Sequence, residues 1–183
     1  PAVLALGRGG QLPDRVPDDQ VLTPQSSYGA QKAVGEMLVH DFARKGFVDG
    51  RSLRLPTVTV RPGKPNKAAS SFASGIVREP LAGVEAPCPV DAATRMWLLS
   101  PRAALANLVA GYEAPASAFP VSHAVNVPGI SVTVGEMIDA LRRVAGDEVA
   151  RRVAFRHDPA IDRIVRTWPR DFDAHAGRAL GMR

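Results

Sequence analysis

The sequence has very few cysteines and no long apolar run, and both absences exclude classes of protein. Cys88 is the only cysteine among 183 residues, so no disulfide can form within the chain, which favours a reducing compartment. The uninterrupted apolar runs are far shorter than the roughly 20 residues that cross a bilayer. The first residues also lack the charged and then apolar layout of a secretory signal. We therefore expect a cytoplasmic protein that has no membrane segment.

Clusters of metal ligands and concentrated basic stretches are also missing. The four histidines are scattered, and His157-Asp158 has no second histidine or cysteine at zinc-ligand spacing, so we expect no metal site. The net charge is +5, but basic and acidic residues are spread over both halves of the chain. A surface that follows phosphates normally concentrates its lysines and arginines. We expect no nucleic-acid partner.

A glycine-rich phosphate loop is the most informative absence. Such a loop needs a strand before it and a helix after it, so that a helix N-terminus meets the pyrophosphate. Residues 7–10 (GRGG) run into a segment with prolines at positions 13 and 17, which cannot be helical throughout. We interpret the segment as a loop, and no other part of the sequence has the required layout.

The sequence does contain the patterns of an ordinary globular α/β protein. Hydrophobic residues make up 45% of it and charged residues 22%. After residue 27, segments with helical periodicity alternate with short segments rich in Val, Leu and Thr, which predicts the α/β class. We expect helices at 27–45, 70–78, 101–111 and 133–146, and strands at 51–61, 94–99, 122–127 and 153–156. In the first helix, the side chains expected to face the core are Ala33, Val34, Met37, Leu38 and Phe42.

The start of the first predicted helix carries a tyrosine and a lysine four residues apart, Tyr28 and Lys32. Residues i and i+4 lie on one helix face, so both side chains reach the same small volume. A phenol is a poor base at neutral pH, and a nearby ammonium favours its phenolate. The pair could therefore remove a proton from an alcohol. The same spacing also occurs on partly exposed helices that have no catalytic role, so the spacing alone leaves both interpretations open.

The residues around this pair resemble a known family. Residues 23–32 (TPQSSYGAQK), followed by Glu36, resemble the catalytic helix of the extended short-chain dehydrogenase/reductases, the NAD-dependent epimerase/dehydratase family. Residues 53–66 (LRLPTVTVRPGKPN) and 69–75 (ASSFASG) resemble a narrower branch, the D-erythronate dehydrogenases. The likeness extends from about Leu12 to the end of the chain, and the second block is the more specific one.

The resemblance implies the C-terminal part of a Rossmann-like doubly wound parallel sheet, joined to a smaller α/β substrate domain. Residues 1–62 would be the remaining part of the dinucleotide-binding domain, with the catalytic helix. Residues 63–183 would be mainly the substrate-binding domain, with possible segments that return to the Rossmann sheet. The N-terminal nucleotide-binding part is then absent from this chain, and we expect residue 1 to fall near the strand that precedes the catalytic helix.

The resemblance also implies a reaction, the NAD-dependent oxidation of the C2 hydroxyl of a four-carbon sugar acid to the 2-oxo acid. Tyr28 would remove the hydroxyl proton, and Lys32 would bind the nicotinamide ribose. A nucleotide-sugar epimerase or dehydratase uses the same pair with a larger substrate, and a non-catalytic fragment of such an enzyme is a third interpretation. The family often dimerises through a bundle that includes the catalytic helix, so a homodimer is possible.

Further site residues follow from the same resemblance. The backbone at Pro56, Thr57 and Val58 would turn past the nicotinamide, so these residues would contact the cofactor. The proline is also compatible with an ordinary kink at a strand end. The family carries a serine about two dozen residues before the tyrosine. Counting back reaches residues 2–4 (AVL), which have no hydroxyl, so the catalytic triad is reduced to a dyad in this sequence.

The substrate side is expected downstream of the strand. Asn66, Ser70 and Ser71 could bind hydroxyls or a carboxylate, although hydroxyls at this point also suit a locally capped helix. Arg95 offers a fork of donors that suits a carboxylate, or it is a solvated strand residue. Trp168, followed by a proline, forms a rigid corner that family members place near the substrate.

Overall fold

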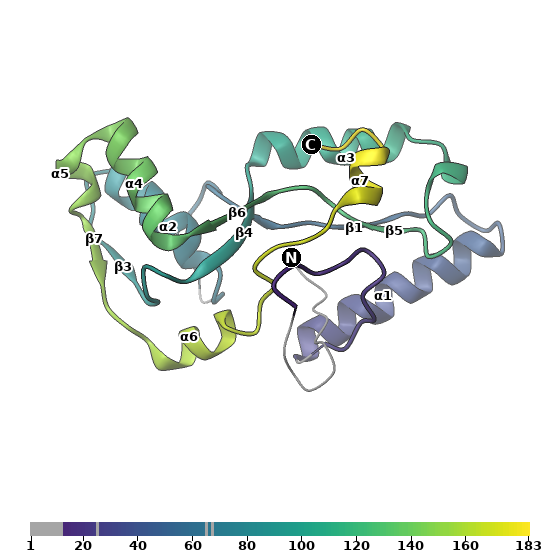
Figure 1. Cartoon of the computed structure of the whole chain (residues 1–183), viewed down its shortest axis with the longest axis horizontal. Helices are drawn as coiled ribbons and strands as arrows, with labels where there is room; N and C mark the ends of the chain where they lie inside the picture. The colour runs from purple at the N-terminus through teal and green to yellow at the C-terminus, as the bar shows by residue number, and fades with distance from the viewer. Residues whose placement is uncertain (1–12, 25, 65, 67) are drawn as a thin grey trace.

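The structure is a computed structural model that describes residues 13–24, 26–64, 66 and 68–183. Two groups of helices and strands lie on either side of a central sheet (Figure 1). In chain order the elements are α1 (Ser27–Arg44), β1 (Ser52–Arg54), β2 (Thr57–Val58), α2 (Ser71–Leu81), β3 (Ala86–Cys88), β4 (Arg95–Leu99), α3 (Pro101–Glu113), a 3-10 turn (Ala116–Ala118), β5 (Ala124–Asn126), β6 (Ile130–Thr133), α4 (Val134–Ala145), α5 (Asp147–Ala150), β7 (Val153–Phe155), α6 (Pro159–Val165) and α7 (His175–Ala179).

Strands β1 and β5 form a parallel pair between two layers of helices. Leu53 of β1 lies opposite Val125 of β5. Figure 1 shows α3 and α7 on one side of this pair and α1 on the other. Ser100 begins α3 as predicted, since its hydroxyl accepts a hydrogen bond from Ala103 N at 3.1 Å. The buried side chains of this half include Leu99, Phe119, Val125, Val127 and Met182.

The central sheet has the order β2-β4-β6, with β2 parallel to β4 and β6 antiparallel to it. The strand predicted at 51–61 is divided at Pro56, because β1 pairs with β5 whereas β2 pairs with β4. Proline has no N–H for a strand ladder, so the chain changes sheets at this residue.

The third parallel pair, β3 and β7, lies with α2, α4 and α5 at the other end of the molecule (Figure 1). Helix α4 begins with the predicted capping box, in which Thr133 and Glu136 each accept a hydrogen bond from the other's backbone N–H. The core of this half is buried between the helices and the strands. It includes Phe72, Ile76, Cys88, Val90, Leu98, Val134, Met137 and Ile138.

The segment before α1 is held against the C-terminal segment at the middle of the molecule. Val16 forms an isolated parallel bridge with Phe172, and Val16 N donates to Asp171 O at 2.9 Å. The ring of Phe172 lies 5.9 Å from that of Trp97 on β4. The side chains of Val16, Trp97 and Phe172 form a small buried cluster. These contacts join the two ends of the described chain to the central sheet.

The prediction that the apolar stripe of α1 faces the core is wrong. Val34, Met37, Leu38 and Phe42 are 59, 62, 55 and 46% exposed. The helix instead turns the opposite face, which contains Tyr28 and Lys32, toward β1. A single pair of strands covers only one side of α1, so the apolar stripe lies outside.

The observed class is α/β with parallel strand pairs, as predicted. Across the described ranges, none of the helices combines the length and hydropathy required to cross a membrane.

Candidate functional site

The first turn of α1 fixes the position of Tyr28. Ser26 is the N-cap and accepts a hydrogen bond from Gly29 N at 3.1 Å. A Cβ added at Gly29 would lie 3.0 Å from the side chain of Pro24, so this turn packs closely on the preceding segment. Tyr28 is 52% exposed, and Lys32 Nζ lies 5.5 Å from the centroid of its ring. The i, i+4 spacing therefore brings the ammonium and the phenol ring together, as predicted.

Tyr28 and Lys32 line a groove between α1 and β1, which we call the β1 groove. The α1 residues that line it recur every three or four positions, as expected for one helix face. The β1 side is formed by Ser52, Leu53, Arg54 and the following Leu55. The α1 side consists of Tyr28, Gln31, Lys32, Gly35, Glu36 and Val39.

An ion pair fixes this helix face against the strand. Arg54 Nε donates to Glu36 Oε2 at 2.9 Å, and Arg54 Nη2 donates to the other carboxylate oxygen. The two side chains are only 12% and 10% exposed. Because a buried charge that loses its partner is costly, this bidentate pair sets the register of α1, and so of Tyr28, against β1. From the sequence alone, a charged residue on a helix does not reveal which oppositely charged residue it will pair with.

A second cavity, of about 460 Å³, adjoins Tyr28, and we call it the Tyr28 cavity. It brings together residues from α1, β2, the N-terminal cap of α2, β4 and the segment after α6. Six of the predicted site residues line it, namely Tyr28, Pro56, Thr57, Ser70, Arg95 and Trp168. Tyr28 thus borders both the cavity and the β1 groove.

The wall of the Tyr28 cavity is mostly apolar, with cationic groups and hydroxyls at a few points. The two charged side chains among the described residues that line it are Arg61 and Arg95. Ser70 is the N-cap of α2, but its side chain makes no capping hydrogen bond, so its hydroxyl is not used to start the helix. A cavity with two guanidinium groups and no carboxylate among its described lining residues favours an anionic ligand.

Four predicted residues lie away from this cavity. Lys32 lies in the β1 groove, and Val58 packs against the buried residues around β5. Asn66 N donates to Ser71 Oγ at 3.1 Å, and Asn66 Oδ1 accepts from Ala68 N at 2.9 Å, so these two side chains stabilise the local turn. The binding roles of these four residues, like those of the six that line the cavity, remain predictions.

Residues 2–4, where the triad serine of the family would fall, lie outside the described residues.

Several cavity residues were not predicted from the sequence. Arg61 lies within the block that resembles the D-erythronate dehydrogenases, so its position was a usable signal. Trp97 and Phe172 meet only through the tertiary fold, and no local pattern indicates them. The unpredicted lining residues that complete the wall include Ser26, Leu55, Met96, Trp97, Ile164 and Phe172.

A neighbouring hollow shares Arg95 with the Tyr28 cavity but has a different charge balance. It is lined by three arginines and three aspartates. Arg166 Nε donates to Asp162 Oδ2 at 2.6 Å, and this bond raises the pKa of the arginine. Arg15 and Asp171 form a further pair at 3.8 Å. Because its charges largely compensate one another, this hollow is a poorer anion site than the Tyr28 cavity.

The described part of the chain contains no cluster of three or more His, Cys, Asp or Glu side chains suited to a metal ion.

Comparison with known proteins gives close relatives over most of the chain. No family model matches. A Cupriavidus necator protein named D-erythronate dehydrogenase is 59% identical over 174 residues, which cover 95% of this chain and 54% of the relative. A Haemophilus influenzae protein of the same name is 47% identical over 175 residues, which cover 96% of this chain and 56% of that protein.

A solved structure has the same fold. The nucleoside-diphosphate-sugar epimerase from Agrobacterium tumefaciens matches with a TM-score of 0.92 and 42% identity, covering 100% of this chain and 53% of that structure. The chain therefore spans about half the length of the relatives it matches, and the matched part is C-terminal in them. These matches confirm the resemblance and the Rossmann-like α/β class predicted from the sequence.

Proposed function

We propose, from this relationship to the D-erythronate dehydrogenases, that the chain forms the catalytic helix and the substrate side of an NAD-dependent sugar-acid dehydrogenase. The observation that carries the proposal is the position of Tyr28, whose side chain borders the β1 groove and the Tyr28 cavity. A catalytic acid–base residue must reach the substrate hydroxyl. In a dehydrogenase the cofactor lies beside that hydroxyl, so the residue should border both the substrate site and the cofactor site. The proposed domain division at residue 62 assigns α1 and β1 to the cofactor side.

The β1 groove has the residues required at the nicotinamide end of a dinucleotide. Lys32 forms no ion pair among the described residues, since Glu36 pairs with Arg54, so its ammonium can donate to ribose hydroxyls. Pro56 and Thr57 are buried and line the adjoining Tyr28 cavity, where they would limit access of water to the reacting carbon. NAD, when bound, supplies the hydride acceptor. The 183 residues contain no glycine-rich phosphate loop, so this chain contributes the nicotinamide end of the site alone.

In the proposed reaction the sugar acid lies in the Tyr28 cavity with its C2 hydroxyl at the phenol. Tyr28 takes the hydroxyl proton as the hydrogen on C2 leaves with its electron pair, so the alcohol becomes the 2-oxo group. Arg95, at the edge of the cavity, attracts the carboxylate. Ser70 and Trp168 contact the remaining hydroxyls and the carbon chain. Ser70, Arg95 and Trp168 lie after residue 62, so the proposed substrate domain contributes to the substrate specificity.

A nucleotide-sugar epimerase remains the second candidate, because the solved structure with 42% identity bears that name. Two observations favour the sugar acid. The relatives at 59% and 47% identity are both named D-erythronate dehydrogenase, and the Tyr28 cavity combines arginines with apolar walls in a volume that is ample for four carbons. A non-catalytic fragment is the third candidate, and an activity assay separates all three.

The proposal predicts that this chain, fused to the N-terminal half of the 59% identical relative, oxidises D-erythronate with NAD, and that Tyr28→Phe lowers the rate by about 10² to 10⁴, the range for loss of a positioned general base. The measurement is the absorbance of NADH, and the matched control is Tyr112→Phe. Tyr112, the other tyrosine in the chain, is 82% exposed on α3 and should be neutral.

Three results would contradict the proposal. Epimerisation of a nucleotide sugar without oxidation of D-erythronate would favour the second candidate. Absence of any turnover by the folded fusion, which contains a phosphate-binding half, would favour the non-catalytic fragment. Equal rates in the wild type and in Tyr28→Phe would remove Tyr28 from the chemistry.

A further inference from the structure

Arg61 combines a fixed backbone with an unpaired guanidinium. Its N–H donates to Ser74 Oγ at 3.0 Å, and its carbonyl accepts from Arg78 Nη1 at 2.7 Å. Across the described residues, no hydrogen bond or ion pair engages the guanidinium itself, which lines the Tyr28 cavity. Both main-chain groups are therefore held by α2, while the charged end of the side chain is available to a ligand.

The contact between Arg61 and α2 belongs to a buried polar network. Ser74 is only 2% exposed, and its hydroxyl lies 3.3 Å from Thr59 Oγ1, which in turn donates to Ala73 O at 2.9 Å. A buried hydroxyl is costly unless it is hydrogen-bonded. Here Ser74 and Thr59 bond to each other, and Ser74 also bonds to the segment that carries Arg61. This network makes the position of the Arg61 backbone well defined before any ligand binds.

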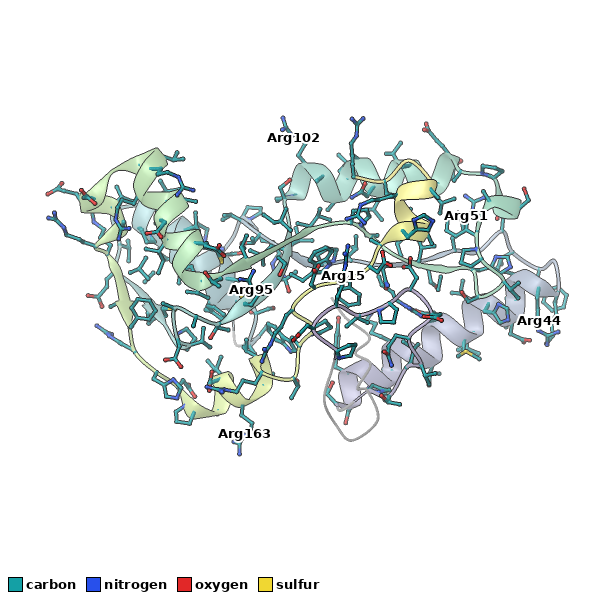
Figure 2. All side chains as sticks on the ribbon, in the orientation of Figure 1. Arg15, Arg44, Arg51, Arg95, Arg102 and Arg163 are labelled. Atoms are coloured by element: carbon teal, nitrogen blue, oxygen red, sulfur yellow. The ribbon has the colours of Figure 1, made fainter. Side chains whose placement is uncertain are left out.

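The other cavity arginine is less free. Arg95 Nη1 donates to Ser131 O at 3.1 Å, and the side chain also borders the hollow that contains Asp14, Asp91 and Asp171. Nearby carboxylates reduce the attraction of Arg95 for an incoming anion. Figure 2 shows Arg95 near the middle of the molecule, and its side chain lines both cavities. Arg61 faces the Tyr28 cavity, where none of the described lining residues is a competing carboxylate.

We propose that Arg61 is the principal anchor for the substrate carboxylate, and that it determines the preference for a sugar acid over a neutral polyol. This inference rests on the proposed function, since it names the group that recognises the acid in the same site. A guanidinium presents two parallel N–H donors to a carboxylate, which adds directionality to charge attraction. Arg95 then supports the anion from the neighbouring wall.

The test is a calorimetric titration of D-erythronate and of erythritol, its neutral analogue, into the wild type and three variants. Arg61→Gln removes the charge and keeps a shorter, uncharged polar side chain. The control is Arg102→Gln, on α3 away from both cavities. We expect Arg61→Gln to weaken binding of the acid by about 10- to 100-fold, as for loss of a charged hydrogen bond, with little change for erythritol. Arg61→Lys should recover part of the affinity.

The outcomes separate this inference from the proposed function. Unchanged affinity of Arg61→Gln for the acid would overturn the anchor and leave the dehydrogenase proposal intact. Equal weakening of acid and polyol would also overturn it, because the guanidinium would then act on the fold. Wild-type protein that does not distinguish acid from polyol would contradict both. A loss of acid preference in Arg61→Gln in a chain without turnover would support the anchor alone.

Discussion

Tyr28 shows how far single residues could be predicted. Its spacing from Lys32 follows from helix geometry alone, and this is why the contact between the two side chains was predictable. The gathering of Ser70, Arg95 and Trp168 around it followed from the family resemblance. Phe172 enters the same wall through packing on Trp97, a residue far away in the sequence. Contacts of that kind depend on the whole fold and leave no local pattern.

The single thiol gives a prediction at the same scale. Cys88 is fully buried, with Sγ 3.4 Å from Val90 O, and burial raises its pKa. Because the thiolate is the reactive form, we expect native protein to react with Ellman's reagent only very slowly, and one thiol per chain to react promptly in guanidinium. Rapid reaction of the native protein, at a rate independent of denaturant, would show that Cys88 is accessible.

Helix α1 shows what periodicity can and cannot predict at the scale of an element. Its bounds were predicted to within a residue at its C-terminus, since capping and periodicity are local properties. Its orientation was not, because the spacing of Val34 and Leu38 gives an apolar face but does not say what lies opposite. The pairing of Glu36 with Arg54 turns the polar face toward β1. Likewise Pro56 indicated a break in a strand, but not that the two parts join different sheets.

The capping box of α4 predicts a dependence of stability on pH. Hydrogen bonds from the backbone and hydroxyl of Thr133 lower the pKa of Glu136 below its ordinary value of 4.5. A carboxylate with a lowered folded-state pKa stabilises the fold fully above its unfolded value, and this contribution is lost as pH falls through the folded value. We expect wild type to unfold at higher urea than Glu136→Gln at neutral pH, and the difference to shrink below about pH 4.5.

The comparison with Glu136→Gln cancels the titration of the other carboxylates, since both proteins carry them. A difference in urea midpoint that stays constant from neutral to acidic pH would mean that the charge of Glu136 does not contribute to the cap.

At the scale of the molecule, the Tyr28 cavity lies where the helix-covered β1–β5 pair meets the central sheet and the segment after α6. The α/β class was predictable from the alternation of patterns. The division into three small sheets was not, because strand pairing joins residues that are distant in sequence. The outer faces of α1 and α3 keep exposed apolar side chains, among them Met37, Phe42, Leu105 and Tyr112. The exposed face of α1 is compatible with a homodimer, which remains a prediction.

The most direct test of the central claim is a spectrum of the chain labelled with ¹³C in its tyrosine rings. Tyr28 and Tyr112 are the only two tyrosines, so two sets of ring signals are expected, and Tyr112→Phe assigns them. Because Tyr28 borders both the β1 groove and the Tyr28 cavity, we predict that D-erythronate and nicotinamide mononucleotide, the nicotinamide end of NAD, added separately, each shift the Tyr28 signals and leave those of Tyr112 unchanged. Tyr28 signals that move with neither ligand would contradict the account.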